Sequence, residues 1–211
     1  MIGIESASGR SSIFIGERLS NLPNHLPSGR VIIITDDNLL RLYRSELPSL
    51  PVLSIGSGES VKSLETVKNL YETLVDLEAD RSTFLVGIGG GVVCDVAGFV
   101  ASTFMRGLRF GFVATTLLAQ VDASVGGKNG VNLGGFKNLV GCFNQPEFVL
   151  CDLRLLDTLP EGEVANGMAE IVKHALIADA GMFAFLEERA AEALALDSAT
   201  IVQLSSRGSK V

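Results

Sequence analysis

The chain gathers side chains suited to charged or hydroxylated ligands in a glycine-rich segment at residues 115–138. The candidate ligand-binding side chains of this segment are Thr115, Thr116, Asp122, Lys128, Asn129, Lys137 and Asn138. Lysine ammonium groups bind phosphate oxygens, and an aspartate carboxylate accepts hydrogen bonds from ligand hydroxyls. A solvated surface loop is the alternative, but such a loop rarely needs so many glycines, because each one costs conformational entropy. We therefore favour a site for a phosphorylated polyol.

A second glycine cluster, at residues 87–91, lies between two apolar runs. Backbone N–H groups at the start of a helix attract anions, so a turn of this kind can hold a phosphate. The dinucleotide-binding fingerprint, however, would place glycine or alanine where Val92 stands. By its spacing alone, the cluster is either a phosphate-binding loop or a tight structural turn.

Two sets of charged residues lie in segments expected to be helical. Asp95 lies in an apolar stretch, where a carboxylate must be paired or hydrogen-bonded, so it is either a core ion pair or cap, or an acceptor for a ligand hydroxyl. Glu170, Lys173 and His174 share one helix face at spacings of three and four residues. Glu170 and His174 are therefore either a metal-binding pair or part of an exposed salt-bridging face. His25 is the only other histidine, so this chain is not expected to complete a structural zinc site.

The elements that must position these residues alternate between strand and helix in the first part of the chain. Apolar or β-branched runs predict strands at 11–15, 31–34, 51–55, 83–91, 110–114 and 147–152. Helical periodicity or composition predicts helices after 35–38 and at 61–77, 92–104, 161–178, 180–195 and 198–206. This order predicts an α/β domain with a parallel sheet over 1–152, followed over 153–211 by the first helices of an all-helical domain that the chain does not complete.

Composition restricts the classes of protein that fit. The chain has 211 residues, of which 47% are hydrophobic and 19% charged, and this excludes disorder. A net charge of -7 argues against nucleic acid as the main partner. Three irregularly spaced cysteines do not form a disulfide framework, so we expect a reducing cytoplasm. We expect neither a signal peptide nor a membrane-spanning segment, because glycine and charge interrupt the apolar runs.

Four ordered segments, 89–107, 115–132, 137–146 and 169–177, together resemble the 3-dehydroquinate synthase family of sugar-phosphate cyclases. The resemblance implies a Rossmann-like NAD-binding domain followed by a helical domain, with NAD and zinc or cobalt as cofactors and a homodimer when the protein is full length. It also implies a shikimate-pathway lyase that serves aromatic amino-acid biosynthesis. Such an enzyme converts 3-deoxy-D-arabino-heptulosonate 7-phosphate to 3-dehydroquinate and phosphate.

The same resemblance assigns roles to individual positions. Cofactor contacts are implied for Asp36, Asn38, Glu59, Lys62, Gly90, Gly91, Asp95, Thr115, Thr116, Lys128, Lys137 and Thr158. Substrate contacts are implied for Arg106, Asp122, Lys128, Lys137, Asn138, Lys173 and Lys210, with Asp122, Lys128 and Lys173 as catalytic residues. Glu170 is the implied metal ligand, and the family's two zinc-binding histidines are expected beyond residue 211. Without the metal we expect Glu170 to pair with Lys173. His174 is not expected to serve as a ligand in its place, because the matching family position packs or hydrogen-bonds elsewhere.

Other functions remain open beside this one. The sequence departs from the family at Ala114, where proline is usual, and at Ala123, where serine is usual. A sister cyclase that makes valiolone-type or inosose-type rings is the first alternative, although the Lys137–Asn138 pair favours the dehydroquinate branch. A dehydrogenase of the glycerol dehydrogenase type would lack the segment 121–128. A non-catalytic NAD-binding module is the third alternative, and we expect this chain to be inactive by itself.

Overall fold

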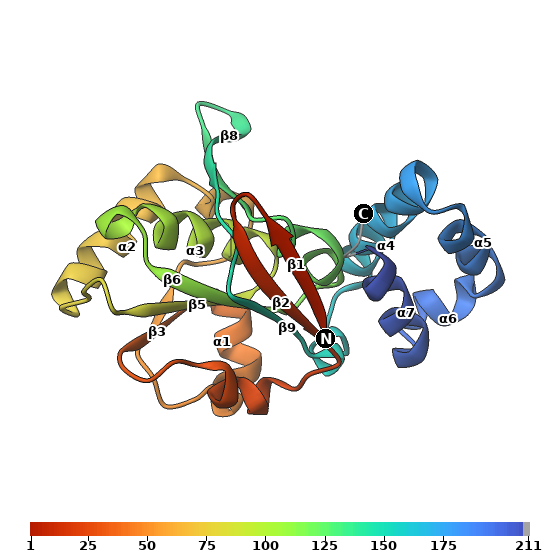
Figure 1. The fold of residues 1–211 in the computed structure, drawn as a ribbon, viewed down its shortest axis with the longest axis horizontal. Helices are drawn as coiled ribbons and strands as arrows, with labels where there is room; N and C mark the ends of the chain where they lie inside the picture. Colours follow the sequence, from red (N-terminus) through yellow and green to blue (C-terminus); the bar gives the residue numbers. More distant parts are fainter. Residues whose placement is uncertain (209–211) are drawn as a thin grey trace.

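A seven-stranded sheet forms the centre of the α/β part in the computed structural model, which describes residues 1–208 (Figure 1). In spatial order its strands are β1 (Ile2–Ser6), β2 (Gly9–Ile15), β9 (Phe148–Cys151), β6 (Arg109–Ala114), β5 (Phe84–Gly89), β3 (Val31–Thr35) and β4 (Val52–Ser54). From β2 across the sheet to β4, each strand is parallel to its neighbour, and only β1 runs antiparallel to β2. The predicted α/β class with a parallel sheet is confirmed, and β1 is a strand that the sequence analysis did not predict.

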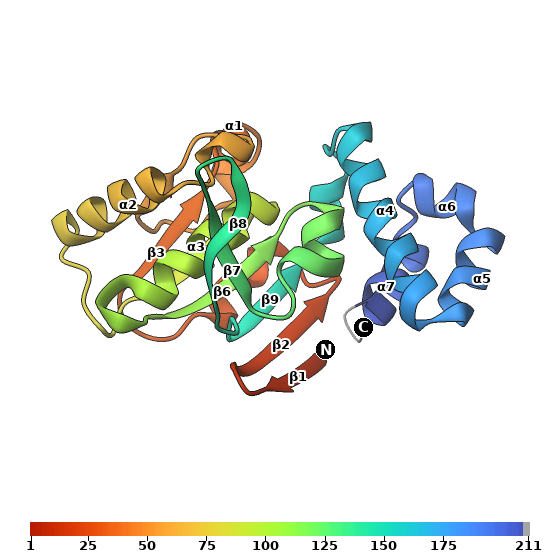
Figure 2. The same cartoon turned by 90° about the horizontal axis from the view of Figure 1, so that it is seen from above.

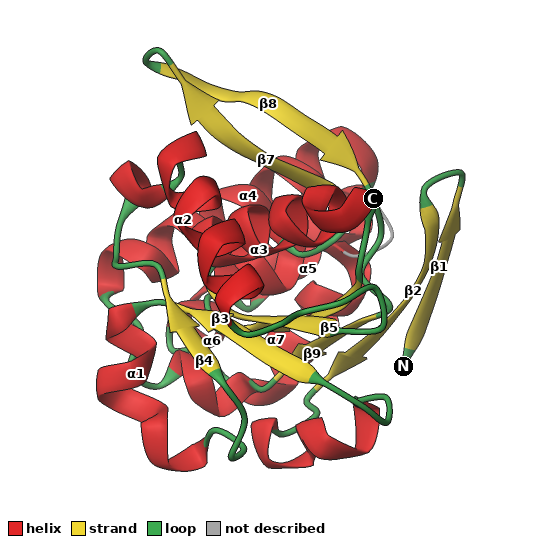
Figure 3. Ribbon diagram, turned by 90° about the vertical axis from the view of Figure 1, so that its left-hand side faces the viewer, coloured by secondary structure: helices red, strands yellow, loops and turns green. Residues whose placement is uncertain are grey.

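Helices cover both faces of this sheet, as Figure 3 shows. Helices α2 (Leu64–Asp76) and α3 (Gly91–Thr103) lie on one face, and α1 (Asp37–Tyr43) lies on the other. Strand β3 is buried on both sides. Ile32 and Ile34 belong to the core cluster of α2 and α3, whereas Val31 and Ile33 belong to the cluster on the opposite face. A strand with two buried faces reads as a continuous apolar run, which is why the sequence identified it.

Side-chain caps fix where the first two of these helices begin. The Asp36 carboxylate accepts a hydrogen bond from the Leu39 N–H, and the Ser63 hydroxyl accepts one from the Thr66 N–H. Such caps satisfy N–H groups that have no partner within the helix. Helix α2 therefore begins after Ser63, not at residue 61 as predicted, and a short 3-10 turn, η3 (Glu59–Val61), precedes it.

The glycine-rich segment forms regular structure that its sequence did not indicate. A π-helical turn, η5 (Ala119–Ala123), leads into an antiparallel hairpin of β7 (Lys128–Leu133) and β8 (Phe136–Phe143). Gly134 and Gly135 make the hairpin turn with φ of +59° and +83°, which glycine adopts without strain. The hairpin packs on α3 and rises away from the main sheet (Figures 1 and 3).

Asn129, a candidate ligand-binding residue in the sequence analysis, instead holds the base of this hairpin. Its buried amide donates hydrogen bonds to the carbonyls of Gly127 and Asn144, each at 2.9 Å. Gly98 of α3 leaves the space it needs, since a Cβ there would lie 1.8 Å from the Asn129 Oδ1. The role of Asn129 is therefore structural.

The helical part lies beside the sheet and consists of α4 (Glu161–Ala178), α5 (Ala180–Glu188), α6 (Ala190–Leu194) and α7 (Ser198–Gly208), as Figure 2 shows. The helix predicted over 180–195 is interrupted at Arg189. Leu117 and Val121, which precede the hairpin, are buried in the same cluster as Ile171 and Leu204. The segment around η5 thus joins the core of the helical part.

Gly167 gives a direct test of this junction. A Cβ at Gly167 would lie 2.6 Å from the Leu117 Cβ and 2.8 Å from the Leu118 backbone nitrogen. We expect Gly167→Ala to lower the free energy of unfolding by about 2 kcal/mol, because overpacking exceeds the gain in helix propensity. Gly162→Ala, in the same helix with open space around it, is the matched control. Equal stability of the two variants in urea unfolding would contradict this packing.

Two further features concern the cysteines and the helices. All three cysteines are free thiols, and burial raises the pKa of Cys151 to about 12. Of the helices within residues 1–208, none combines the length and the apolar character that crossing a bilayer requires.

Candidate functional site

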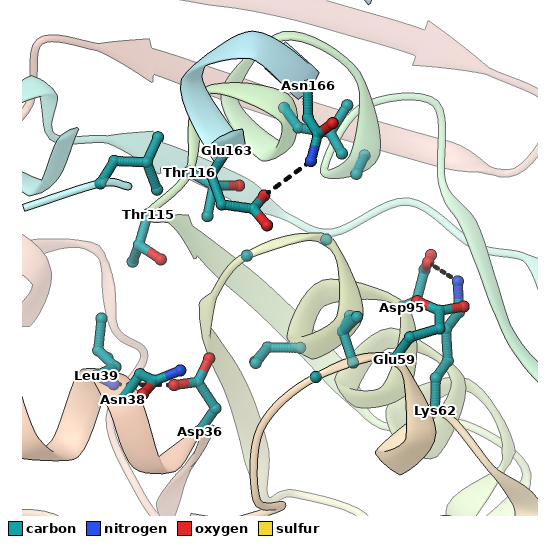
Figure 4. A pocket seen from close by; sticks show the side chains of 18 of the residues that line it. Asp36, Asn38, Leu39, Glu59, Lys62, Asp95, Thr115, Thr116, Glu163 and Asn166 are labelled. Carbon is teal, nitrogen blue, oxygen red and sulfur yellow. Dashed lines mark hydrogen bonds and ion pairs between the residues drawn. The ribbon is translucent and has the colours of Figure 1, made fainter. Parts of the chain in front are cut away.

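A cleft of about 950 Å³ lies at the carboxyl ends of the parallel strands. Asp36 follows β3, Gly90 follows β5, and Thr115 follows β6, so three neighbouring strands deliver their next residues to one edge of the sheet. Helix α4 supplies the opposite wall through Glu163 and Asn166 (Figure 4). Ligands of open α/β sheets bind at this edge, and the volume lies within the usual range for ligand pockets.

Most of the residues predicted from the resemblance line this cleft. They are Asp36, Asn38, Glu59, Lys62, Gly90, Gly91, Asp95, Thr115, Thr116, Asp122, Lys128, Lys137, Asn138, Thr158 and Glu170. The hairpin explains how three of them reach it, because Lys128 begins β7 whereas Lys137 and Asn138 lie at the start of β8. The lysines are therefore carried by a paired hairpin, which is stiffer than the open loop that the sequence indicated.

Two predicted substrate contacts do not line this cleft, and a third falls outside the part of the chain that the structure describes. Arg106 follows the C-terminal end of α3, whereas the cleft contacts the N-terminal end of that helix. The 13 residues of α3 separate the two ends by about 20 Å, so this chain does not bring Arg106 to its own cleft. Lys173 lies just outside the cleft, where it pairs with Glu170. Lys210 lies outside the described residues.

The glycine turn presents bare backbone to the cleft. Gly90 caps α3, and a Cβ at Gly90 would lie 2.9 Å from the Thr116 Cγ2. A Cβ at Gly91 would lie 3.2 Å from that of Ala123. Because α3 is a 13-residue helix whose N–H groups begin here, the turn is placed to hold an anion.

Lys62 and Asp95 form an ion pair in the cleft wall, and Figure 4 shows them beside Glu59. Their side chains are only 6% and 19% exposed. Burial raises the pKa of Asp95, although the hydrogen bond and charge of Lys62 oppose this shift. The structure thus contains the core ion pair that the sequence analysis left open for Asp95, and it places that pair against the cleft.

A possible cation site lies at the helical end of the cleft. One ligand atom each from Asp122, Glu170 and His174 lies within 4.8 Å of the others. Two carboxylates and an imidazole suit zinc or cobalt, so these residues fit a divalent cation in part. The Lys173 ammonium contacts the Glu170 carboxylate, which raises the pKa of Lys173 and confirms the expected ion pair.

Two of the expectations for His174 are wrong, whereas its metal-binding pair with Glu170 stays a prediction. The ring is buried, so an exposed salt-bridging face is wrong for this residue. Its Nε2 lies 3.6 Å from the Asp122 Oδ1, so it lies beside the proposed site and does not pack away from it. Only the tertiary fold reveals this contact, because η5 and α4 are far apart in sequence.

The sequence analysis missed several residues that line the cleft, and Glu163, Asn166 and Tyr43 are among them. Glu163 and Asn166 lie on the face of α4 that carries Glu170, and the Asn166 amide donates to the Glu163 carboxylate at 3.5 Å. Their spacing of seven and four residues from Glu170 along the helix was the available signal. Tyr43 also lines the cleft, and its hydroxyl lies 2.8 Å from that of Thr158, which links α1 to the segment before α4.

Comparison with known sequences identifies the family to which this chain is similar. Residues 52–166 match the family model described as 3-dehydroquinate synthase N-terminal. A 3-dehydroquinate synthase of a Geobacter species, strain M21, is 42% identical over 189 residues, which cover 85% of this chain and 52% of that protein. The chain thus spans about half the length of this curated relative.

Two solved structures have a similar fold. The 2-epi-5-epi-valiolone synthase ValA from Streptomyces hygroscopicus, with NAD+ and Zn2+ bound, has a TM-score of 0.87 and 27% identity. That match covers all of this chain and 61% of ValA. A 2-deoxy-scyllo-inosose synthase complexed with carbaglucose-6-phosphate, NAD+ and Co2+ has a TM-score of 0.69 and 29% identity, and the match covers 92% of this chain and 59% of that structure.

Proposed function

We propose, since the chain belongs to the 3-dehydroquinate synthase family, that it forms the NAD-binding part and first helices of an enzyme with that activity. The whole protein would convert 3-deoxy-D-arabino-heptulosonate 7-phosphate to 3-dehydroquinate and phosphate, a carbon–oxygen lyase reaction. The single observation that carries the proposal is the cleft, in which the residues assigned by the family resemblance meet at the strand ends.

The division of the cleft supports separate places for cofactor and substrate. Asp36 and Asn38 lie on the α1 side (Figure 4), and the turn at Gly90, which follows β5, offers backbone N–H groups to the same cleft. In this proposal the glycine turn binds the pyrophosphate of NAD, and Asp36 accepts hydrogen bonds from a ribose. Lys128 and Lys137, at the hairpin end, neutralise the substrate phosphate.

The residues have distinct duties in the proposed reaction. Bound NAD would supply reversible hydride transfer at the carbon that bears a substrate hydroxyl, so the overall reaction would not be an oxidation. Asp122 accepts a hydrogen bond from a substrate hydroxyl, and Lys128 holds substrate close to the nicotinamide. Glu170 would supply one ligand to a divalent cation in the complete protein, and that cation would lower the pKa of a bound hydroxyl. Lys173 balances the charge of Glu170 and contacts the substrate carboxylate.

A related cyclase of the valiolone or inosose type is the second candidate. The structural similarity to ValA favours it, because that match extends over the whole chain. The Lys137–Asn138 pair and the 42% identity to a named 3-dehydroquinate synthase favour the first candidate. Phosphate release by the complete protein, measured with each sugar phosphate, separates the two.

The proposal extends to the assembly and its compartment. Phe136 and Phe143 of the hairpin are 67% and 75% exposed, and burial against a second copy in a homodimer would remove this apolar surface from water. Three free thiols favour a cytoplasmic location. The net charge of -7 disfavours a nucleic-acid partner.

NAD titration of this chain by calorimetry tests the cofactor site. We expect weak to moderate binding by the wild-type chain, and about tenfold weaker binding by Gly90→Ala, whose methyl group would press on Thr116. Gly162→Ala is the control, because its methyl group enters open space. A wild-type chain that gives no heat at millimolar NAD, or a Gly90→Ala variant that binds like the control, would contradict the assignment.

A further inference from the structure

The Asn132 side chain of β7 bridges two residues that line the cleft, Glu59 and Asn138. Its Nδ2 donates a hydrogen bond to the Glu59 Oε1 at 2.8 Å, and its Oδ1 accepts one from the Asn138 N–H at 2.9 Å. The family resemblance implies that Glu59 is a cofactor contact and that Asn138 is a substrate contact.

The backbone of Asn132 is fixed independently of these two contacts. Its N–H donates to the Lys62 carbonyl at 3.0 Å, and it forms a parallel bridge with Ser63. The segment 59–63 and β7 are therefore tied through the main chain. Because its main chain is fixed, Asn132 can use its side chain to orient the Glu59 carboxylate and the Asn138 N–H.

The residues that it holds need such support. Asn138 has a φ of +54°, in the left-handed region that residues with a Cβ adopt at a cost, although asparagine tolerates it better than most. The bond to Asn132 stabilises this conformation at the start of β8. The neighbouring Lys137 Nζ lies 3.9 Å from the same Glu59 Oε1, so Glu59 meets both the hairpin lysine and Asn132.

We propose that Asn132 is a positioning residue that couples the cofactor side of the cleft to the substrate clamp at 137–138. This rests on the proposed function, because Glu59 is taken as an NAD contact. When a ligand orders Glu59, the amide is held in place, and less entropy remains to be lost when Asn138 and Lys137 bind substrate. An amide suits this task because it offers a donor to Glu59 and an acceptor to Asn138 at once.

Two substitutions separate these contacts. Asn132→Ala removes both hydrogen bonds, whereas Asn132→Asp retains an acceptor for the Asn138 N–H and sets a second carboxylate against Glu59. Asn21→Asp is the matched control, because the Asn21 amide donates to Glu17 at 2.7 Å without lining the cleft. Unfolding temperatures of all variants identify any general loss of structure.

Amide hydrogen exchange over residues 134–140 and NAD titration provide the readouts. Without NAD, we expect exchange in Asn132→Ala to be about threefold to tenfold faster than in the wild type, and in Asn132→Asp close to the wild-type rate. NAD should slow this exchange in the wild type and in Asn21→Asp, but not in Asn132→Ala or Asn132→Asp. Equal slowing in all four proteins would overturn the proposal.

A third variant makes the test independent of the proposed function. Without NAD, Glu59→Ala should speed exchange over 134–140 in the wild-type background, but add nothing to Asn132→Ala, because the effect passes through Asn132. Additive effects would refute the coupling even if NAD binds well. If NAD does not bind but the effects are non-additive, the proposed function fails and the coupling between Glu59 and the hairpin stands.

Discussion

Lys128→Ala and Asp122→Ala, each made in the complete protein, are expected to lower kcat by about a hundredfold or more with little change in unfolding temperature. The physical reason is the position of the two side chains. Both line the cleft; Lys128 is exposed, and Asp122 is partly exposed and belongs to no hydrophobic core cluster. Their removal costs the charge that positions substrate, not the packing of the fold.

The measurement is turnover per folded molecule, with phosphate release as the signal. Lys68→Ala is the matched control, because Lys68 is a surface lysine of α2 whose partners Glu65 and Glu72 lie at 3.7 Å. The control should retain wild-type turnover. Variants of Lys128 or Asp122 that melt early but turn over normally would show that these residues are structural.

Lys62→Met is expected to lower the free energy of unfolding by about 3 kcal/mol near neutral pH, because it leaves the buried Asp95 carboxylate without its counter-charge. The loss should shrink in acid. Burial already raises the pKa of Asp95 above 3.8, and loss of the Lys62 ammonium raises it further. The folded variant therefore binds the proton more tightly than the unfolded chain, so its stability is greatest below the unfolded pKa and falls as pH rises through the folded pKa.

Urea unfolding at pH 5 and at pH 8 measures this difference. Asp95→Asn combined with Lys62→Met is the control, because it removes the charge that has lost its partner. The double variant should recover much of the stability at the higher pH. A single variant whose loss is the same at both pH values would show that the ion pair does not govern the stability of this wall.

The sequence predicted the sheet because the signals for its strands are local. Val31–Thr35 and Phe84–Gly89 are continuous apolar runs, which is the pattern of strands buried on both faces. Their ends carry the site residues, since the carboxyl ends of parallel strands share one edge. The family resemblance added the roles of these residues, and the fold brought most of them to one cleft.

The β7–β8 hairpin could not be predicted in the same way. Its strands carry glycine and polar residues, and most of β8 is exposed, so no alternation of apolar and polar residues marks it. Its register depends on pairs such as Lys128 with Phe143, which the turn geometry and the packing of Asn129 against Gly98 select. The Asn129 contact joins β7 to α3, a helix that is distant in the sequence.

The sequence by itself determined the parallel sheet, the helix start at residues 35–38 and the glycine turn, because each depends on residues within a few positions of one another. The tertiary structure decided the contacts across the cleft: Lys62 with Asp95, Glu59 with Asn132, and Asp122 with His174. It also decided that Arg106 lies at the far end of α3 from the cleft. The physical reason is that burial and charge pairing act between segments far apart in the chain, and local patterns carry no record of which segments will meet.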